Sequence, residues 1–319
     1  MNTKYLIAPV AVIAVIVVAA FVYIYYQGQT SSQLEPLHGL VDDTGYVTSL
    51  DALPNKIVSL APSATEILFA LGLDEKVVAV SDYCEYPYNF SAWIAAGNMT
   101  SIGDFSNPNM EAIASLTPDL IIATGGVQAE TVDTLRALSY KVLVLNPHNV
   151  TGVLQNIELV GNATGKTSEA NTLIASINGR IDAVVNTVAG AASRPKVYYE
   201  VYYETTSAWT IGSLAYQNEL IEKAGGTNLF GDQQKDYYQY QVEALIARNP
   251  DVILLPASGM GTGSLQNLDA VKARPAWDTT NAVKNDRLYQ IDSNLIELAT
   301  PRVADAIEQL AEFFHPELF

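Results

Sequence analysis

One pattern of thirteen residues occurs twice in this 319-residue chain. Residues 110–122 read MEAIASLTPDLII and residues 242–254 read VEALIARNPDVIL, with a glutamate second in each copy. This glutamate precedes a Pro-Asp pair by seven residues, and an apolar run typical of a buried strand follows the pair. A helix, Pro-Asp and a strand are common in succession. Two copies with equal spacing, 132 residues apart, indicate two lobes of one design.

Short apolar strands alternate with helices along most of the chain, after a hairpin predicted over Val41–Leu53 around Asp-Thr-Gly. Such alternation favours an α/β fold with mostly parallel sheets covered by helices on both faces. The predicted strands are 56–60, 77–80, 120–123, 141–145, 196–203, 252–255 and 288–291, and the predicted helices are 65–72, 130–138, 218–226 and 301–314.

The alternation stops at residues 149–188, where two helices follow each other. The first runs to about Ala163, Gly165 breaks it, and the second begins near Thr167. Apolar residues recur on the second helix at three- and four-residue steps over about five turns. These residues are Ala170, Leu173, Ile174, Ile177, Ile181, Val184, Val185 and Val188.

This long helix between two α/β segments predicts a rigid spine that joins two lobes. The predicted domains are an N-terminal lobe at 37–165, a spine helix at 166–190 and a C-terminal lobe at 191–319. The alternative is an ordinary crossover helix within a single sheet.

The first residues of the chain have a different character. Tyr5–Tyr26 contains no charged residue, and only Lys4 and the amino terminus provide positive charge before it. A helix of this length spans about 33 Å, enough to cross a hydrocarbon core. We therefore predict a transmembrane anchor at 1–26 that leaves the remainder outside the cell membrane, and a flexible linker at 27–36.

A cleaved secretory signal is the alternative for this segment, although its apolar stretch is usually only about 7–15 residues long. The single cysteine, Cys84, lies far from the segment, which excludes a lipid-modified cysteine directly after the apolar run.

Charge and motif content disfavour several classes of function. The formal net charge of −17 argues against binding to nucleic acid. The sequence contains no Gly-x-Ser-x-Gly, His-Glu-x-x-His or Cys-x-x-Cys motif and no phosphate-binding loop, so we expect no catalytic residues. The only histidines are His38, His148 and His315, which weighs against a bare zinc or manganese site. We therefore expect neither a metal site nor a cofactor.

Tyrosine is abundant, with 18 residues, several of them clustered. Clusters lie at 83–88 and 237–240, and within the strand at 196–203, with Trp209 soon after. Residues beyond the carboxyl ends of parallel strands line the crevice in which α/β folds bind ligands. Flat rings with a hydroxyl group suit a large planar or chelated ligand. One face of the strand at 196–203 must be core, so at most half of its tyrosines are candidates.

Several of these segments together resemble the ABC-importer binding proteins that include cobalamin-, haem- and ferric-siderophore-binding members. The resemblance runs from about Val41 to the end of the chain. It is carried by KIVSLAPSATEI at 56–67, SDYCEYP at 81–87, ATPR at 299–302, the spine helix and the two Glu/Pro-Asp units. It implies two α/β lobes bridged by a rigid helix, little hinge closure and a ligand clamped between the lobes. It also implies that Glu111 and Glu243, one from each lobe, dock on arginines of an ABC permease, which works with an ATPase.

Within this class, residues 81–87 are most similar to the cobalamin binders, in which the first tyrosine of the stretch contacts the corrin; here it is Tyr83. Cobalamin binders place tryptophan six residues before each docking glutamate, where this chain has Phe105 and Tyr237. With Trp209, these are the predicted contacts to a corrinoid chelate. A ferric siderophore or haem is the alternative ligand. An extracytoplasmic enzyme or a tethered sensor on the same frame is the alternative from another class.

Overall fold

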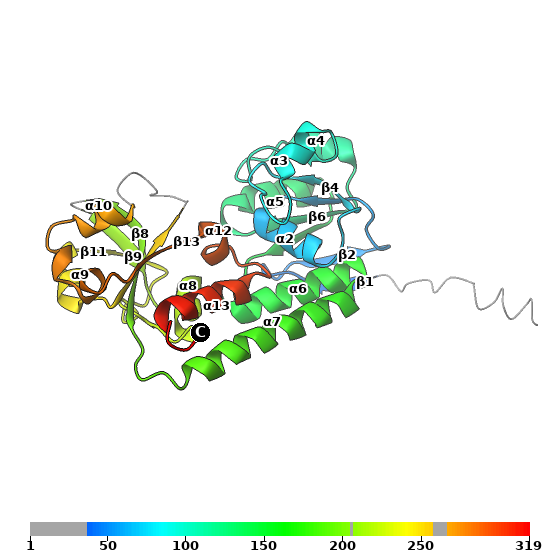
Figure 1. The fold of residues 1–319 in the computed structure, drawn as a ribbon. Helices are drawn as coiled ribbons and strands as arrows, with labels where there is room; N and C mark the ends of the chain where they lie inside the picture. The colour runs from blue at the N-terminus through cyan, green and yellow to red at the C-terminus, as the bar shows by residue number, and fades with distance from the viewer. Residues whose placement is uncertain (1–36, 205–206, 258–266) are drawn as a thin grey trace, which may run out of the picture.

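The computed structural model describes residues 37–204, 207–257 and 267–319. The predicted anchor at 1–26 and the linker at 27–36 lie outside these ranges. Among the described residues, no helix is long and apolar enough to cross a membrane. The fold is α/β and contains two separate main sheets, with long helices running alongside both (Figure 1).

The first sheet has five parallel strands in the order β5-β4-β3-β6-β7. Its strands are β3 Ile57–Ser59, β4 Val77–Val80, β5 Thr100–Ser101, β6 Leu120–Thr124 and β7 Val142–Leu145; its helices are α2 Pro62–Ala70, α3 Phe90–Ala95, α4 Met110–Leu116, the 3₁₀ turn η1 Gly126–Gln128 and α5 Ala129–Ala137. The strands and helices predicted in this half are confirmed, because strands covered on both faces form continuous apolar runs. The N-terminal hairpin is also present as β1 Leu37–Val41 and β2 Val47–Leu50, and its first strand begins before the predicted Val41.

The second sheet has the order β11-β9-β8-β12-β13, with β10 also pairing with β8. Its strands are β8 Lys196–Glu204, β9 Ser207–Ile211, β10 Thr227–Asn228, β11 Tyr237–Tyr240, β12 Val252–Pro256 and β13 Leu288–Ile291; the helices of this half are α8 Tyr216–Lys223, α9 Val242–Arg248, α10 Leu268–Lys272, η3 Trp277–Thr279, α11 Asn281–Lys284, α12 Ser293–Ile296 and α13 Val303–Phe314. The strands β8, β10, β12 and β13 are parallel, whereas β9 and β11 run antiparallel to their neighbours. Neither β9 nor β11 is predicted from the sequence.

Both faces of β8 are buried, and neighbouring tyrosines of the strand show this. The sequence pattern predicts only one of the two faces to be core. Tyr198 and Tyr199 point to opposite sides of the strand, and both side chains are buried. Tyr198 packs against Trp277, while Tyr199 belongs to the apolar cluster on the other side. The sheet is covered on both sides, so burial alone does not separate structural from functional tyrosines.

Two helices connect the sheets, as predicted: α6 Val150–Thr164 and α7 Thr167–Val188. They are separated by Gly165, whose φ of 74° ends the first helix in a left-handed conformation. The helix α7 packs against α6 and against the C-terminal α13. The strands before and after the helix pair, β7 and β8, belong to different sheets, so the alternative of a crossover within one sheet is wrong.

One apolar cluster continues from the first sheet through these helices into the second sheet. It includes Leu143 of β7, Ile157 of α6, Ile181 of α7, Leu310 of α13 and Leu254 of β12. Protein interiors are packed as densely as organic crystals, so halves that share a core do not slide past each other without breaking it. The two halves are thus held more firmly than domains joined by a linker alone.

Candidate ligand-binding cleft

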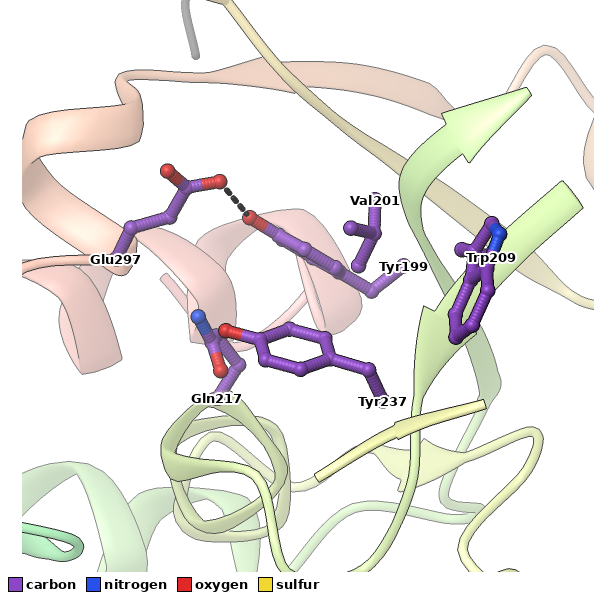
Figure 2. A pocket seen from close by; sticks show the side chains of 6 residues that line it. All are labelled: Tyr199, Val201, Trp209, Gln217, Tyr237 and Glu297. Atoms are coloured by element: carbon purple, nitrogen blue, oxygen red, sulfur yellow. Dashed lines mark hydrogen bonds between the residues drawn. The ribbon is translucent and has the colours of Figure 1, made fainter. Parts of the chain in front are cut away.

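A hollow of about 360 Å³ opens on the second sheet (Figure 2). Tyr199 and Val201 reach it from β8, Trp209 from β9 and Tyr237 from β11, while Gln217 of α8 and Glu297, directly after α12, complete the lining. In the ladder, Trp209 lies opposite Gln239, so Tyr237 is its diagonal neighbour on the same face of the sheet. This register places two predicted ligand contacts side by side.

A second hollow of about 400 Å³ has walls from both halves of the molecule. The first half contributes Pro62, Tyr83, Glu85 and Phe105, and the second half contributes Ser293, Asn294, Glu297 and Leu298. The Tyr83 and Phe105 rings meet edge to face with centroids 5.3 Å apart. The Tyr83 hydroxyl donates a hydrogen bond to Asp104 (3.0 Å), and this bond raises the pKa of Tyr83. Hydrogen bonds from Ser106, and then the bond from Tyr83, lower the pKa of Asp104.

The two hollows adjoin at Glu297, which lines both, and we refer to them together as the cleft. The four predicted aromatic residues lie in two pairs around this carboxylate: Tyr83 with Phe105, and Trp209 with Tyr237. Tyr83 is 54% exposed and Tyr237 is 52% exposed, which leaves large ring surfaces uncovered. The structure therefore places all four residues around one cleft, and their contact with a ligand remains a prediction.

Glu297 is held at the junction by a hydrogen bond from the Tyr199 hydroxyl to Oε1 (2.9 Å; Figure 2). The residue faces the open cleft, yet burial of its carboxyl raises the pKa, and the hydrogen bond from Tyr199 offsets part of that increase. Burial, and then the charge of Glu297, raises the pKa of Tyr199, which keeps this hydroxyl a donor. Burial, and then the charge of Glu297, also raises the pKa of Tyr237.

Sequence reasoning missed Glu297 and Gln217, and it left Tyr199 among the strand tyrosines of which at most half are candidates. Glu297 lies only two residues before the Ala299–Arg302 segment that carries part of the resemblance, which is the one signal that points toward it. Tyr199 has the pattern of a core residue and is buried, and its hydroxyl donates to Glu297 at the cleft.

The charged side chains that line the cleft are all acidic in the described part of the chain. The described lining includes the carboxylates of Glu85 and Glu297 and contains no lysine, arginine or histidine. In the described part of the chain, no group of three or more His, Cys, Asp or Glu residues is arranged to hold a metal ion. The cleft can thus offer aromatic faces and hydrogen-bond acceptors to a ligand.

Direct contacts between the halves fix the width of the cleft. Arg302 donates to both carboxylate oxygens of Glu66, from Nε at 2.9 Å and from Nη2 at 2.6 Å. The guanidinium also stacks over the Tyr86 ring at 4.3 Å. Beside the second hollow, the Asn294 amide donates to Glu85 (3.1 Å). Both ion-pair partners come from segments that carry the resemblance, 56–67 and 299–302.

Glu111 and Glu243 lie on the first turns of α4 and α9, in different halves, and both are exposed. The side chain of Asn109 caps α4 by accepting from two backbone amides, so Glu111 is not needed as a cap. Neither glutamate forms an ion pair with another described residue. A third hollow, of about 510 Å³, adjoins Glu243 between α9 and Pro275.

Comparison with known proteins supports the fold and identifies the family. A profile of the periplasmic binding protein family matches residues 57–295. An uncharacterized ABC transporter substrate-binding lipoprotein of Bacillus subtilis is 31% identical over 273 residues, which cover 83% of this chain and 82% of that protein. A cobalamin-binding protein of Halobacterium salinarum is 27% identical over 281 residues, covering 86% and 73%. The structure of a periplasmic haem-binding protein from Roseiflexus superposes with a TM-score of 0.71 at 26% identity, covering 83% of this chain and 99% of that one. The chain belongs to the periplasmic binding protein family, whose members are substrate-binding components of transporters.

Proposed function

We propose that this protein captures a corrinoid metal chelate outside the cell membrane and delivers it to the permease and ATPase of an ABC importer. The observation that carries the proposal is the cleft itself. It has aromatic pairs on two sides, the carboxylate of Glu297 at its junction, the carboxylate of Glu85 in the second hollow and no basic side chain in its described lining.

Size and charge together favour a corrinoid. Two adjoining hollows of about 360 and 400 Å³ suit a large ligand, and exposed rings suit the flat, partly apolar face of a macrocycle. The rim of a corrin carries carboxamides, which are neutral and donate hydrogen bonds to carboxylates. The cobalamin-binding relative from Halobacterium gives the same indication.

Haem is the competing ligand, because the Roseiflexus haem-binding protein has the same fold. Haem carries propionates, and a carboxylate ligand near Glu85 and Glu297 would face like charge with no compensating cation in the described lining. Ferric siderophores with neutral hydroxamate groups escape this objection, so they are the second alternative. A tethered sensor would bind the same ligands without stimulating a transporter, and an enzyme would convert them.

Binding measurements on the full-length chain in detergent test the proposal. We expect cyanocobalamin to bind with higher affinity than haemin or ferrichrome, as measured by titration calorimetry. We expect Tyr83→Ala and Tyr237→Ala each to weaken this binding by up to about tenfold, because a lost aromatic contact is worth about 0.5–1.5 kcal/mol beyond area burial.

The matched control is Tyr46→Ala, an exposed tyrosine on the N-terminal hairpin that does not line the cleft. Tighter binding of haemin than of the corrinoid would refute the ligand assignment. Unchanged corrinoid affinity in both cleft variants would show that the ligand binds elsewhere.

The proposal includes the lobe bounds 37–165, 166–190 and 191–319 and the transmembrane anchor at 1–26. We expect protease added to intact cells to remove the lobes, while the protein before digestion sediments with membranes. Mature protein that begins near residue 27 and is free in the medium would instead identify the segment as a cleaved signal.

A further inference from the structure

We propose that Glu297 selects the ligand by accepting hydrogen bonds from N–H donors on the ligand's rim and by repelling chelates that place a carboxylate there. This inference rests on the proposed function and identifies the residue that would give the cleft its preference for amide-bearing corrinoids.

The backbone around Glu297 is fixed before a ligand arrives. The residue ends the short helix α12, and its amide donates to the carbonyl of Ser293 (2.8 Å). At the other end of α12, the side chain of Asp292 accepts from the amide of Asn294 (2.9 Å). The side chain is oriented by Tyr199, which donates to Oε1. Within the described ranges no other residue donates to this carboxylate, so Oε2 is available to a ligand.

A ligand that fills both hollows must remove water from this carboxylate, because Glu297 belongs to the lining of both. Burial already raises its pKa in the empty cleft, and further loss of water adds to the cost of its charge. A ligand amide that donates to the carboxylate replaces the lost water. A ligand carboxylate provides no donor and adds like-charge repulsion.

Among the residues that the structure describes, no cation lines either hollow to relieve this repulsion. Arg302 reaches the backbone carbonyl of Asn294 at the edge of the second hollow (3.5 Å). Its guanidinium, however, is paired with Glu66 through two hydrogen bonds and lies against the Tyr86 ring. The charge at the junction of the hollows is therefore set by Glu297, with Glu85 contributing from the second hollow alone.

The test compares two corrinoids that differ at the rim: dicyanocobinamide, whose side chains end in amides, and dicyanocobyrinic acid, whose side chains end in carboxylates. Both are titrated into the full-length wild type, Glu297→Gln, Glu85→Gln and Tyr199→Phe. The glutamine at 297 keeps an oxygen acceptor for Tyr199 and removes the charge. We expect the wild type to bind dicyanocobinamide more tightly than dicyanocobyrinic acid. Glu297→Gln should reduce the ratio of these two affinities by about fivefold or more.

The controls separate selection from structural support. Glu85→Gln removes a carboxylate from the same cleft and should narrow the affinity ratio less than Glu297→Gln does. Tyr199→Phe retains the Glu297 charge but removes the hydrogen bond that orients it, so it should also narrow the ratio less than Glu297→Gln does. Equal losses of affinity for both ligands in Glu297→Gln, or an equal narrowing in Glu85→Gln, would overturn the assignment of Glu297 while the proposed function stands. Failure of the wild type to bind either corrinoid would refute the proposed function itself.

Discussion

Replacing Arg302 by methionine is expected to lower the free energy of unfolding by about 3–5 kcal/mol, because the substitution leaves a buried carboxylate without its cation. Glu66 is only 4% exposed, and Arg302 satisfies both of its oxygens. The pair also joins segments 236 residues apart, one from each half. Urea unfolding of the full-length chain, followed by near-ultraviolet circular dichroism, measures the effect.

Two variants give this experiment its contrast. Lys272→Met removes a lysine paired with Asp286, a partner with a 79% exposed side chain, and should change stability by less than about 1 kcal/mol. The double variant Glu66→Gln, Arg302→Met removes both charges and should recover part of the loss, since the unpaired buried charge causes most of it. A stability change in Arg302→Met no larger than in Lys272→Met would show that the pair contributes little to holding the halves together.

Glu111→Ala and Glu243→Ala are expected to abolish most transport while leaving the isolated protein intact. Truncating one partner of a charge pair at an interface costs about 2–5 kcal/mol, so each variant should weaken docking by at least about thirtyfold. In the protein alone, a first-turn carboxylate contributes only about 0.3–1 kcal/mol through the helix dipole. Melting temperature and corrinoid affinity should therefore stay nearly unchanged, and ligand-stimulated ATP hydrolysis by the reconstituted transporter should fall, most of all in the double variant.

Glu130→Ala is the matched control for docking, because Glu130 is also an exposed glutamate on the first turn of a helix, α5. It should leave transport unchanged. A collapse of corrinoid affinity in Glu111→Ala or Glu243→Ala, with normal ATP hydrolysis per bound ligand, would place these glutamates in the binding cleft and refute the docking role.

The central strands and the helix pair are predictable from the sequence because their signals are local. Strands such as β6 and β12 are continuous apolar runs, and Gly165 marks the break between α6 and α7. The strands β9 and β11 are not predictable in this way. Their sequences, SAWTI and YYQY, mix polar and aromatic residues. They are strands because β9 pairs with β8 and β11 pairs with β9.

The site residues differ in the same way: some have local sequence signals and others depend on tertiary contacts. The four aromatic residues could be named because a resemblance and a clustering of rings in the sequence pointed to them. Glu297 could not, since its position depends on a hydrogen bond from Tyr199, 98 residues earlier, and on the meeting of two hollows. Contacts of this kind follow from tertiary structure and leave no spacing in the chain.

The packing of α13 also determines when the core shared by the two halves can close during synthesis of the chain. This last helix buries Val303, Ile307, Leu310 and Phe314 in the core that both halves share. The chain is made from the N-terminus, so the strands of the first sheet and the helix α7 are synthesised long before α13. Until the residues of α13 are released, the side of α7 that α13 covers stays exposed. A chain that terminates before α13 would thus expose an apolar surface to proteases and chaperones. We expect such a chain to be degraded rather than to function in a shorter form.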